Sequence, residues 1–156
     1  MSDPIIERIN SLGITLPPAP AAVANYVPFV IAGDLLYVSG QVSRDASGAI
    51  IAGRLGADLT VDQGKHAARQ CALAILAQAN AALGGLSRIA GLVRLNGFVN
   101  ATAEFADHPM VVNGASDLMV DVLGEAGRHT RIAVGVASLP AGCAVEIDAV
   151  IRIKTA

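Results

Sequence analysis

The segment from residue 60 to residue 84 constrains the fold most, because small and aliphatic side chains recur in it at helical spacing. Thr60 and Gln63 have the spacing of a capping box, and Gly84 with Gly85 supplies a typical stop. The side chains that would share one face of this helix are Ala68, Cys71, Ala72, Ile75, Leu76, Ala79 and Leu83. Because most of them are small, we expect the helix to pack closely on a sheet.

Runs rich in β-branched residues predict the strands of that sheet. The predicted strands are residues 26–32, 35–41, 89–99, 131–138 and 143–153. Gly33-Asp34 is a two-residue link of the kind that closes a hairpin between the first two strands, and residues 139–142 predict a turn between the last two. Gly91 and Gly97 indicate bulges or close backbone approaches within the third strand.

The N-terminal part of the chain has a different character. Residues 3–12 predict a short helix capped by Ser2 or Asp3. Three closely spaced prolines follow and predict an extended connector. We therefore divide the chain into an N-terminal helix with a Pro-rich connector, residues 1–20, and a single domain, residues 21–156.

Two further segments complete the predicted order of elements. Residues 43–60 are rich in Gly, Asp and Ser and predict a loop with room for one small strand at 49–52. A second helix of the domain is expected to begin near Pro109 and to end around Gly124 or Gly127. The order ββ(β)αβαββ predicts an α+β fold in which two helices cover one face of a single mixed sheet.

The opposite face of that sheet needs a covering of another kind. The chain has 53% hydrophobic and only 15% charged residues, with 11 Lys and Arg against 13 Asp and Glu. This is little charge for the surface of a free monomer of 156 residues. We take the excess of apolar surface as an indication of contacts between subunits.

Charge and chain composition disfavour several classes of protein. The net charge of −2 and the absence of a Lys/Arg cluster argue against a nucleic-acid partner. No run approaches the roughly 20 apolar residues that span a bilayer, and residues 1–10 do not resemble a secretion signal. We therefore expect a cytoplasmic protein without a membrane partner, in which Cys71 and Cys143 are buried and reduced.

The common catalytic motifs are missing from the sequence. There is no P-loop, no GxGxxG after a strand, no GxSxG elbow and no HExxH. His66, His108 and His129 lack metal-ligand spacing, so a solvent-facing or capping role is favoured for each and no metal site is predicted. His129 stands out among them because it lies between Arg128 and Arg131.

Two charged residues occupy strand positions that an ordinary surface does not require. Arg131 opens the strand 131–138, and Glu146 lies within the last strand, where Val145, Ile147 and Ala149 mark the apolar face and Glu146 shares the opposite face with Asp148. The pattern alone favours solvent exposure for this face. A guanidinium at a strand end is nevertheless suited to binding a small carboxylate through two parallel hydrogen bonds.

Four segments in the same order resemble a known family. They are Asn25–Val27, Tyr37–Gln41, Gly97–Val99, and the C-terminal pair Arg131–Pro140 with Val145–Ala149. Together they resemble the Rid family of reactive intermediate deaminases, also called the YjgF family. The Pro-rich start and the long link from Gln41 to Thr60 are similar to a longer subgroup of that family.

The resemblance implies a chorismate-mutase-like fold and a homotrimer whose three sheets form a central barrel, with clefts between subunits. It also implies hydrolysis of 2-imino acids and their enamine tautomers to 2-keto acids and ammonia, without a metal or an organic cofactor. By position, Arg131 would hold the carboxylate of the substrate and Glu146 would position or activate water. An alignment through Arg128 instead would break the match at Leu139 and Pro140, so Arg131 is preferred.

The resemblance implies further substrate-binding residues. Tyr26 matches a tyrosine that closes the cleft, and Ser39 and Gly40 match a strand segment that lines it. Asn113 is a weaker match to an asparagine that precedes the second helix of the domain. Ala133 stands where archetypal members often have cysteine.

Two other functions compete with the deaminase hypothesis. The same cleft would suit a small-carboxylate sensor or interaction module that binds its ligand without turnover. An endoribonuclease, a name attached to parts of the family, is less favoured because the chain is acidic and has few aromatic residues for stacking on bases.

Overall fold

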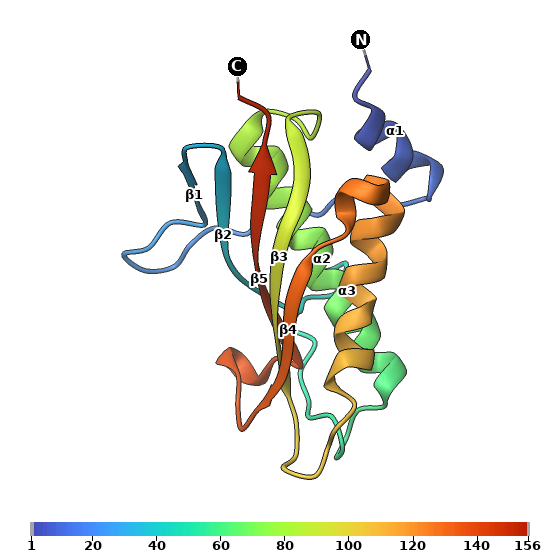
Figure 1. Ribbon diagram of the computed structural model, residues 1–156. Coiled ribbons are helices and arrows are strands. Elements are labelled where there is room, and N and C mark those ends of the chain that lie inside the picture. Colours follow the sequence, from blue (N-terminus) through green and yellow to red (C-terminus); the bar gives the residue numbers. More distant parts are fainter. Residues whose placement is uncertain (1, 156) are drawn as a thin grey trace.

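The computed structural model describes residues 2–155 and shows one sheet backed by helices (Figure 1). In chain order the elements are α1 (Pro4–Ser11), β1 (Phe29–Ala32), β2 (Leu35–Val42), α2 (Val61–Leu83), β3 (Ile89–Asn100), α3 (His108–Leu123), β4 (Thr130–Val136) and β5 (Val145–Ile153). Two short 3₁₀ turns, Gly124–Gly127 and Pro140–Gly142, flank β4. The predicted order of helices and strands is confirmed, apart from the small strand at 49–52.

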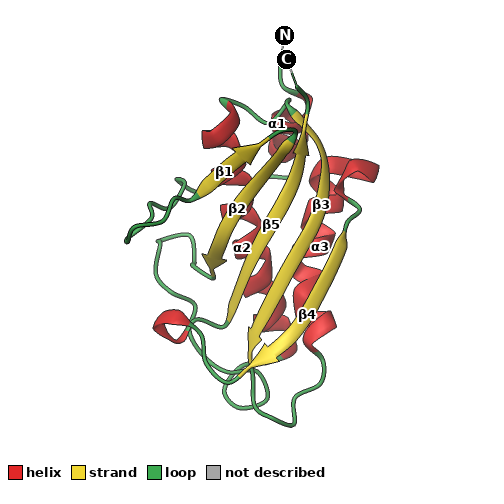
Figure 2. Cartoon of the chain, turned by 60° about the vertical axis from the view of Figure 1, so that its left-hand side comes forward, coloured by secondary structure: helices red, strands yellow, loops and turns green. Residues whose placement is uncertain are grey.

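The five strands lie in the order β1-β2-β5-β3-β4. β3 and β4 are parallel, and every other neighbouring pair is antiparallel. A parallel pair needs a crossover connection, which α3 provides. Helices α2 and α3 lie against the same face of the sheet, as predicted (Figure 2).

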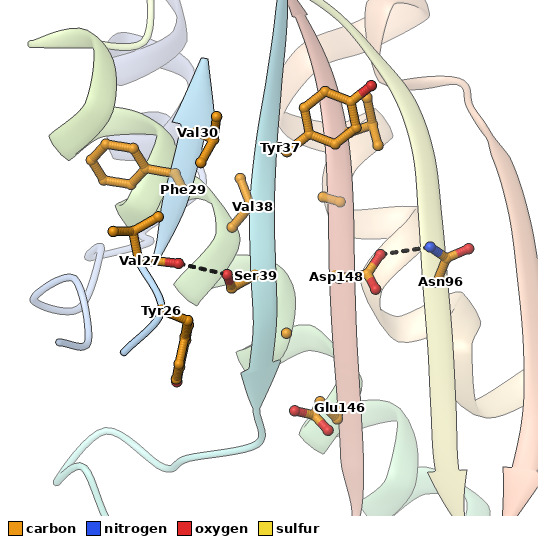
Figure 3. A pocket seen from close by; sticks show the side chains of 13 residues that line it. Tyr26, Val27, Phe29, Val30, Tyr37, Val38, Ser39, Asn96, Glu146 and Asp148 are labelled. Atoms are coloured by element: carbon orange, nitrogen blue, oxygen red, sulfur yellow. Dashed lines mark hydrogen bonds between the residues drawn. The ribbon is translucent and has the colours of Figure 1, made fainter. Parts of the chain in front are cut away.

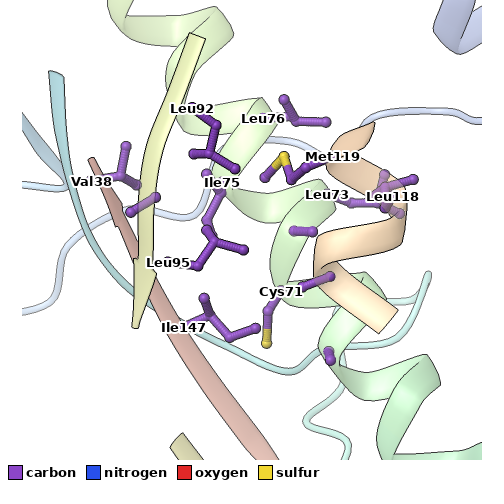
Figure 4. Packing of buried hydrophobic residues seen from close by; sticks show 14 of the residues in the cluster. Val38, Cys71, Leu73, Ile75, Leu76, Leu92, Leu95, Leu118, Met119 and Ile147 are labelled. Atoms are coloured by element: carbon purple, nitrogen blue, oxygen red, sulfur yellow. The ribbon is translucent and has the colours of Figure 1, made fainter. Parts of the chain in front are cut away.

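Helix α2 supplies the centre of the core (Figure 4). The capping box forms as predicted: Thr60 accepts a hydrogen bond from the Gln63 backbone, and the Gln63 side chain accepts one from the Thr60 backbone. Gly84 ends the helix in the left-handed conformation, with φ of 68°. The small side chains of α2 are buried against α3 and the sheet, since alanines allow the close approach that larger residues would prevent.

Strand β5 shows how the two faces of the sheet differ. Its alternate residues from Val145 to Ile153 are buried beneath the helices. Glu146 and Asp148 project from the other face, and in the described chain nothing covers that face. Large apolar side chains are exposed on it, with exposed fractions of 50% for Val30, 46% for Tyr37 and 41% for Ile132.

Helix α1 forms where the sequence predicted it. Asp3 is its cap and accepts hydrogen bonds from two backbone N–H groups of the first turn. Ile9 is only 2% exposed, and Arg8 donates a hydrogen bond to the carbonyl of Asp121 on α3. The helix therefore packs on the α3 side of the molecule. The division of the chain at residue 20, between the N-terminal part and the domain, stays a prediction.

Several predicted boundaries are wrong, for local physical reasons. β1 begins at Phe29 rather than at residue 26, because Pro28 lacks the N–H that a strand ladder requires. Residues 49–52 form isolated bridges, not a strand, as the chain turns too soon to continue either ladder.

The last two strands are also shorter than predicted. β4 ends at Val136 because its partner β3 ends opposite it, at Asn100. β5 begins at Val145, since the 3₁₀ turn Pro140–Gly142 uses the backbone N–H of Cys143.

Both cysteines are free and buried, as predicted. Burial raises the pKa of each thiol, most strongly for Cys71. Among residues 2–155, no helix is long and apolar enough to cross a membrane.

Candidate functional site

Two adjoining cavities meet at Glu146. The first, which we call the sheet-face cleft, has a volume of about 580 Å³ and lies on the uncovered face between β1, β2, β5 and Asn96 of β3 (Figure 3). The second, which we call the connector pocket, has a volume of about 320 Å³. It is bounded by the connector at residues 20–23, by β2 and by Arg44. A small molecule in either cavity would lie beside the same carboxyl group.

Gly40 creates the space in which the Glu146 carboxyl lies. The two residues belong to neighbouring antiparallel strands, where the pairing of β2 with β5 is interrupted between Val38 and Gln41. A Cβ atom on residue 40 would stand 2.8 Å from Glu146 Oε1 and 3.1 Å from its Cδ. Glycine at this position therefore permits the carboxyl to lie against the strand.

The two acids of the uncovered face have different environments. Asp148 accepts a hydrogen bond of 2.6 Å from Asn96 Nδ2, and Asn96 Oδ1 accepts one of 2.9 Å from Arg94 Nε. Within residues 2–155, no group donates a hydrogen bond to the Glu146 carboxyl. Burial raises the pKa of Glu146 above its ordinary value of 4.5, and the charge of Asp148 raises it further. Glu146 is thus the acid that remains available for proton transfer.

Tyr26 and Ser39 border the sheet-face cleft (Figure 3). The Ser39 hydroxyl donates to the carbonyl of Val27 at 2.8 Å, and its backbone N–H donates to the carbonyl of Pro28 at 2.9 Å. Both bonds attach the segment that precedes β1 to β2. Tyr26, which is 51% exposed, is held beside the cleft by this attachment.

Gln78 on α2 holds Pro20 of the connector in the wall of the connector pocket. This residue was not identified from the sequence. Its side chain is 1% exposed, and its Nε2 donates to the carbonyl of Pro20 at 2.6 Å. A glutamine on the buried face of an Ala-rich helix is the sequence signal that could have found it.

Arg131 and Asn113 lie elsewhere, at the edge of the sheet that β4 forms. Arg131 is aligned with Leu95, whose side chain faces the helices, whereas Glu146 is aligned with Phe98 three residues further along β3. Arg131 Nη1 donates to Asn113 Oδ1 of α3 at 2.8 Å. Since successive side chains alternate between faces, Arg131 and Glu146 of one chain occupy opposite sides of the sheet.

The six residues predicted for the site thus form two groups. Tyr26, Ser39, Gly40 and Glu146 surround the sheet-face cleft, and Arg131 and Asn113 are hydrogen-bonded to each other at the β4 edge. Arg128, the alternative to Arg131, makes an exposed ion pair with Glu125 at 3.2 Å.

Of the two roles that the sequence favoured for His129, the structure agrees with capping and not with solvent exposure, because its Nδ1 contacts the carbonyl oxygen of Gly127 at the end of a 3₁₀ turn. His129 is half-buried, and its Nε2 lies 2.9 Å from the hydroxyl of Ser116, which in turn contacts Arg131. Ser116 carried no signal in the sequence, because only the packing of α3 on β4 places it there. No group of three or more His, Cys, Asp or Glu side chains in the described part of the chain could hold a metal ion.

Comparisons with known proteins agree with this architecture. Residues 6–150 match the family described as "YjgF/chorismate_mutase-like, putative endoribonuclease". Protein TCP17 of Trypanosoma cruzi is 48% identical over 151 residues, which cover 96% of this chain and 94% of that protein.

Two crystal structures show the same fold at different levels of similarity. Atu1372, a protein of unknown function from Agrobacterium tumefaciens, is 50% identical with a TM-score of 0.90, and the match covers 97% of this chain and 94% of that chain. RidA from an Antarctic Psychrobacter is 30% identical with a TM-score of 0.61, covering 86% of this chain and 94% of that chain. The extent and the level of these matches, together with the sheet order and the two covering helices, show that the chain belongs to the YjgF/chorismate-mutase-like family.

Proposed function

We propose that this protein hydrolyses 2-imino acids and their enamine tautomers to 2-keto acids and ammonia, in clefts that form between copies of the chain. The observation that carries the proposal is the Glu146 carboxyl. It is partly buried in a cavity, has a raised pKa, and has no hydrogen-bond donor among the described residues. Such a group is suited to exchanging protons with a water molecule and a substrate nitrogen.

The protein need only orient the substrate and transfer protons in this reaction, since an iminium carbon is already electrophilic. Ionised Glu146 takes a proton from water as the water oxygen adds to the imine carbon. Glu146 then gives that proton to the nitrogen of the resulting carbinolamine. The C–N bond breaks, the C=O bond forms, and the hydroxyl proton passes through Glu146 to the departing ammonia. Water and iminium are thereby converted to a 2-keto acid and ammonium.

Arg131 is proposed to bind the carboxylate of the substrate, as a fork of two N–H donors suits this anion. Arg131 and Glu146 lie on opposite sides of the sheet within one chain. The proposed cleft therefore combines Glu146 of one copy with Arg131 of another. The exposed apolar side chains of the uncovered face support such packing, and the family resemblance suggests a homotrimer.

Turnover of an imino acid generated in situ by an amino acid oxidase tests the proposal. Wild-type protein should accelerate the appearance of the keto acid, and Arg131→Ala should abolish the acceleration. Arg131→Lys should restore only a small part of it, because an ammonium keeps the charge but lacks the fork. Arg128→Ala, which removes only an exposed ion pair, is the matched control and should behave as wild type. An unchanged rate in Arg131→Ala would contradict the proposal.

The same geometry could bind a carboxylate without turning it over. Calorimetric titration with pyruvate separates the two functions. Binding without any acceleration of imine hydrolysis would favour a metabolite sensor or interaction module over the deaminase. An endoribonuclease is disfavoured by Glu146 and Asp148, two acids on the cleft wall that would repel a phosphate backbone.

A further inference from the structure

Within the described residues, the hydrogen bonds of Arg131 leave two N–H donors of its guanidinium free, one on Nε and one on Nη2. An arginine side chain has five N–H donors in a fixed plane. Nη1 donates to Asn113 Oδ1 at 2.8 Å and to Ser116 Oγ at 3.1 Å, and Nη2 donates to the carbonyl of Pro109 at 3.2 Å. The two donors that remain without a partner in residues 2–155 belong to Nε and Nη2. These nitrogens form one edge of the group, the geometry that binds a carboxylate through two parallel bonds.

The chemistry of His129 shows how Ser116 can accept a bond from Arg131. His129 Nδ1 lies 2.6 Å from the carbonyl oxygen of Gly127, which can only accept, so Nδ1 carries the hydrogen. In the neutral ring Nε2 is then an acceptor, and the Ser116 hydroxyl at 2.9 Å donates to it. The lone pairs of Ser116 Oγ are thereby turned toward Arg131.

This arrangement is a chain of three side chains that starts on the backbone of one 3₁₀ turn and ends on the guanidinium. Gly127 closes the turn after α3, Ser116 lies on α3, and Arg131 lies on β4. The side chains of Ser116, His129 and Arg131 are all half-buried, so the hydrogen bonds between them are partly shielded from water. Rotation of the guanidinium would break two or three bonds at once.

We propose that Ser116 and His129 are positioning residues that orient the free N–H donors of Arg131 toward the carboxylate of the substrate. Neither touches the substrate, and neither takes part in proton transfer. The inference rests on the proposed function, in which Arg131 binds that carboxylate. It predicts that the two residues affect binding of the anion and leave the chemical step at Glu146 unchanged.

Ser116→Ala removes the acceptor while leaving the packing of α3 almost unchanged, and Ser116→Thr keeps the hydroxyl. Ser116→Ala should raise KM for the imino acid about three- to tenfold with kcat unchanged, as expected for the loss of one hydrogen bond. It should raise the Kd for pyruvate by the same factor. Ser116→Thr should remain close to wild type in both measurements. His129→Leu should resemble Ser116→Ala, and His129→Gln, whose Oε1 can accept from Ser116, should restore binding.

A neighbouring hydroxyl provides a control for general loosening of β4. Thr130 Oγ1 donates to the carbonyl of Val93 at 2.9 Å and does not contact the guanidinium. Thr130→Val should leave KM and Kd unchanged. In the Arg131→Ala background, Ser116→Ala should have no further effect on pyruvate binding, since the residue acts through Arg131.

The outcomes separate this inference from the function on which it rests. A wild-type protein that neither hydrolyses imines nor binds pyruvate would overturn both. A wild-type protein that does both, with KM unchanged in Ser116→Ala, would overturn the positioning role alone. An effect of Thr130→Val as large as that of Ser116→Ala, or a further loss of pyruvate binding on adding Ser116→Ala to Arg131→Ala, would also overturn it.

Discussion

At the scale of single residues, the candidate site depends on Gly40 as much as on Glu146, because the lack of a side chain at position 40 leaves room for the Glu146 carboxyl. Gly40 has an ordinary backbone conformation, so its value lies in the space that a Cβ would remove. Asp148 shows the contrast, because a hydrogen bond from Asn96 fixes its carboxylate. Glu146 is held by shape alone and keeps its oxygens available.

Gly40→Ala is expected to displace the Glu146 carboxyl, since the new Cβ would lie 2.8 Å from Oε1. The end of a glutamate side chain can move, so the fold should tolerate the change while imine turnover falls about ten- to hundredfold. Gly91→Ala is the matched control on the same sheet, because its Cβ would meet its nearest atom at 3.4 Å. Turnover and thermal unfolding of both variants check this expectation, and full activity in Gly40→Ala would contradict it.

The raised pKa of Glu146 also predicts a dependence of stability on pH. The folded state binds the proton more tightly than the unfolded state, so this group lowers the free energy of unfolding as pH rises from 4.5 through its folded pKa. Glu146→Gln removes the titration. Urea unfolding at a fixed protein concentration should show Glu146→Gln becoming more stable relative to wild type as pH rises from 4 to 7. A stability difference that stays constant over this range would show that the carboxyl is not destabilised by burial.

At the scale of secondary-structure elements, the contact between α2 and α3 places Asn113 and Ser116 over the edge of the sheet. Gly114 permits this contact, because a Cβ there would collide with the carbonyl oxygen of Lys65 on α2. The capping box and the small-residue face predicted α2 from sequence. The distance between the two helices could not be predicted, since it depends on which glycine meets which backbone atom.

Gly114→Ala should therefore destabilise the protein by about 3 kcal/mol, as overpacking against a rigid backbone does. Gly64→Ala on α2 is a graded comparison. Its Cβ would meet only side-chain atoms, at 2.9 Å for Leu55 and 3.0 Å for Val111, which can move aside. Urea unfolding should show a smaller loss for Gly64→Ala than for Gly114→Ala, and equal losses would contradict a backbone collision.

At the scale of the whole molecule, the proposed site requires more than one copy of the chain. Co-expression of Arg131→Ala with Glu146→Gln tests this directly. In a ring of three, each mixed trimer contains one interface that pairs an intact Arg131 with an intact Glu146. Random mixing should then restore imine turnover to about a quarter of the wild-type rate, although each variant alone is inactive. Mixed trimers without activity would contradict a shared cleft, and a monomeric mass in sedimentation would contradict the trimer.

The sequence by itself determined the elements and their order. Capping residues, glycine stops and the alternation of β5 are local signals, and local interactions suffice to start and end α2, β2 and α3 within one or two residues. The early start predicted for β1 shows the limit, because the residues before Pro28 have strand-like side chains and no continuing ladder. The residues of the candidate site were predicted from the resemblance of the strand motifs to those of the Rid family.

Only the tertiary structure decided how those residues are grouped. The alignment of β3 with β4 and β5 sends Arg131 and Glu146 to opposite faces, and it depends on contacts between segments distant in the chain. The same is true of Ser116, which reaches Arg131 only because α3 crosses back over β4. It is true also of α1, whose packing on α3 no local pattern indicated. Short-range physics fixes the elements, whereas contacts between them are set by the packing of the whole chain, and that packing brings the polar groups together.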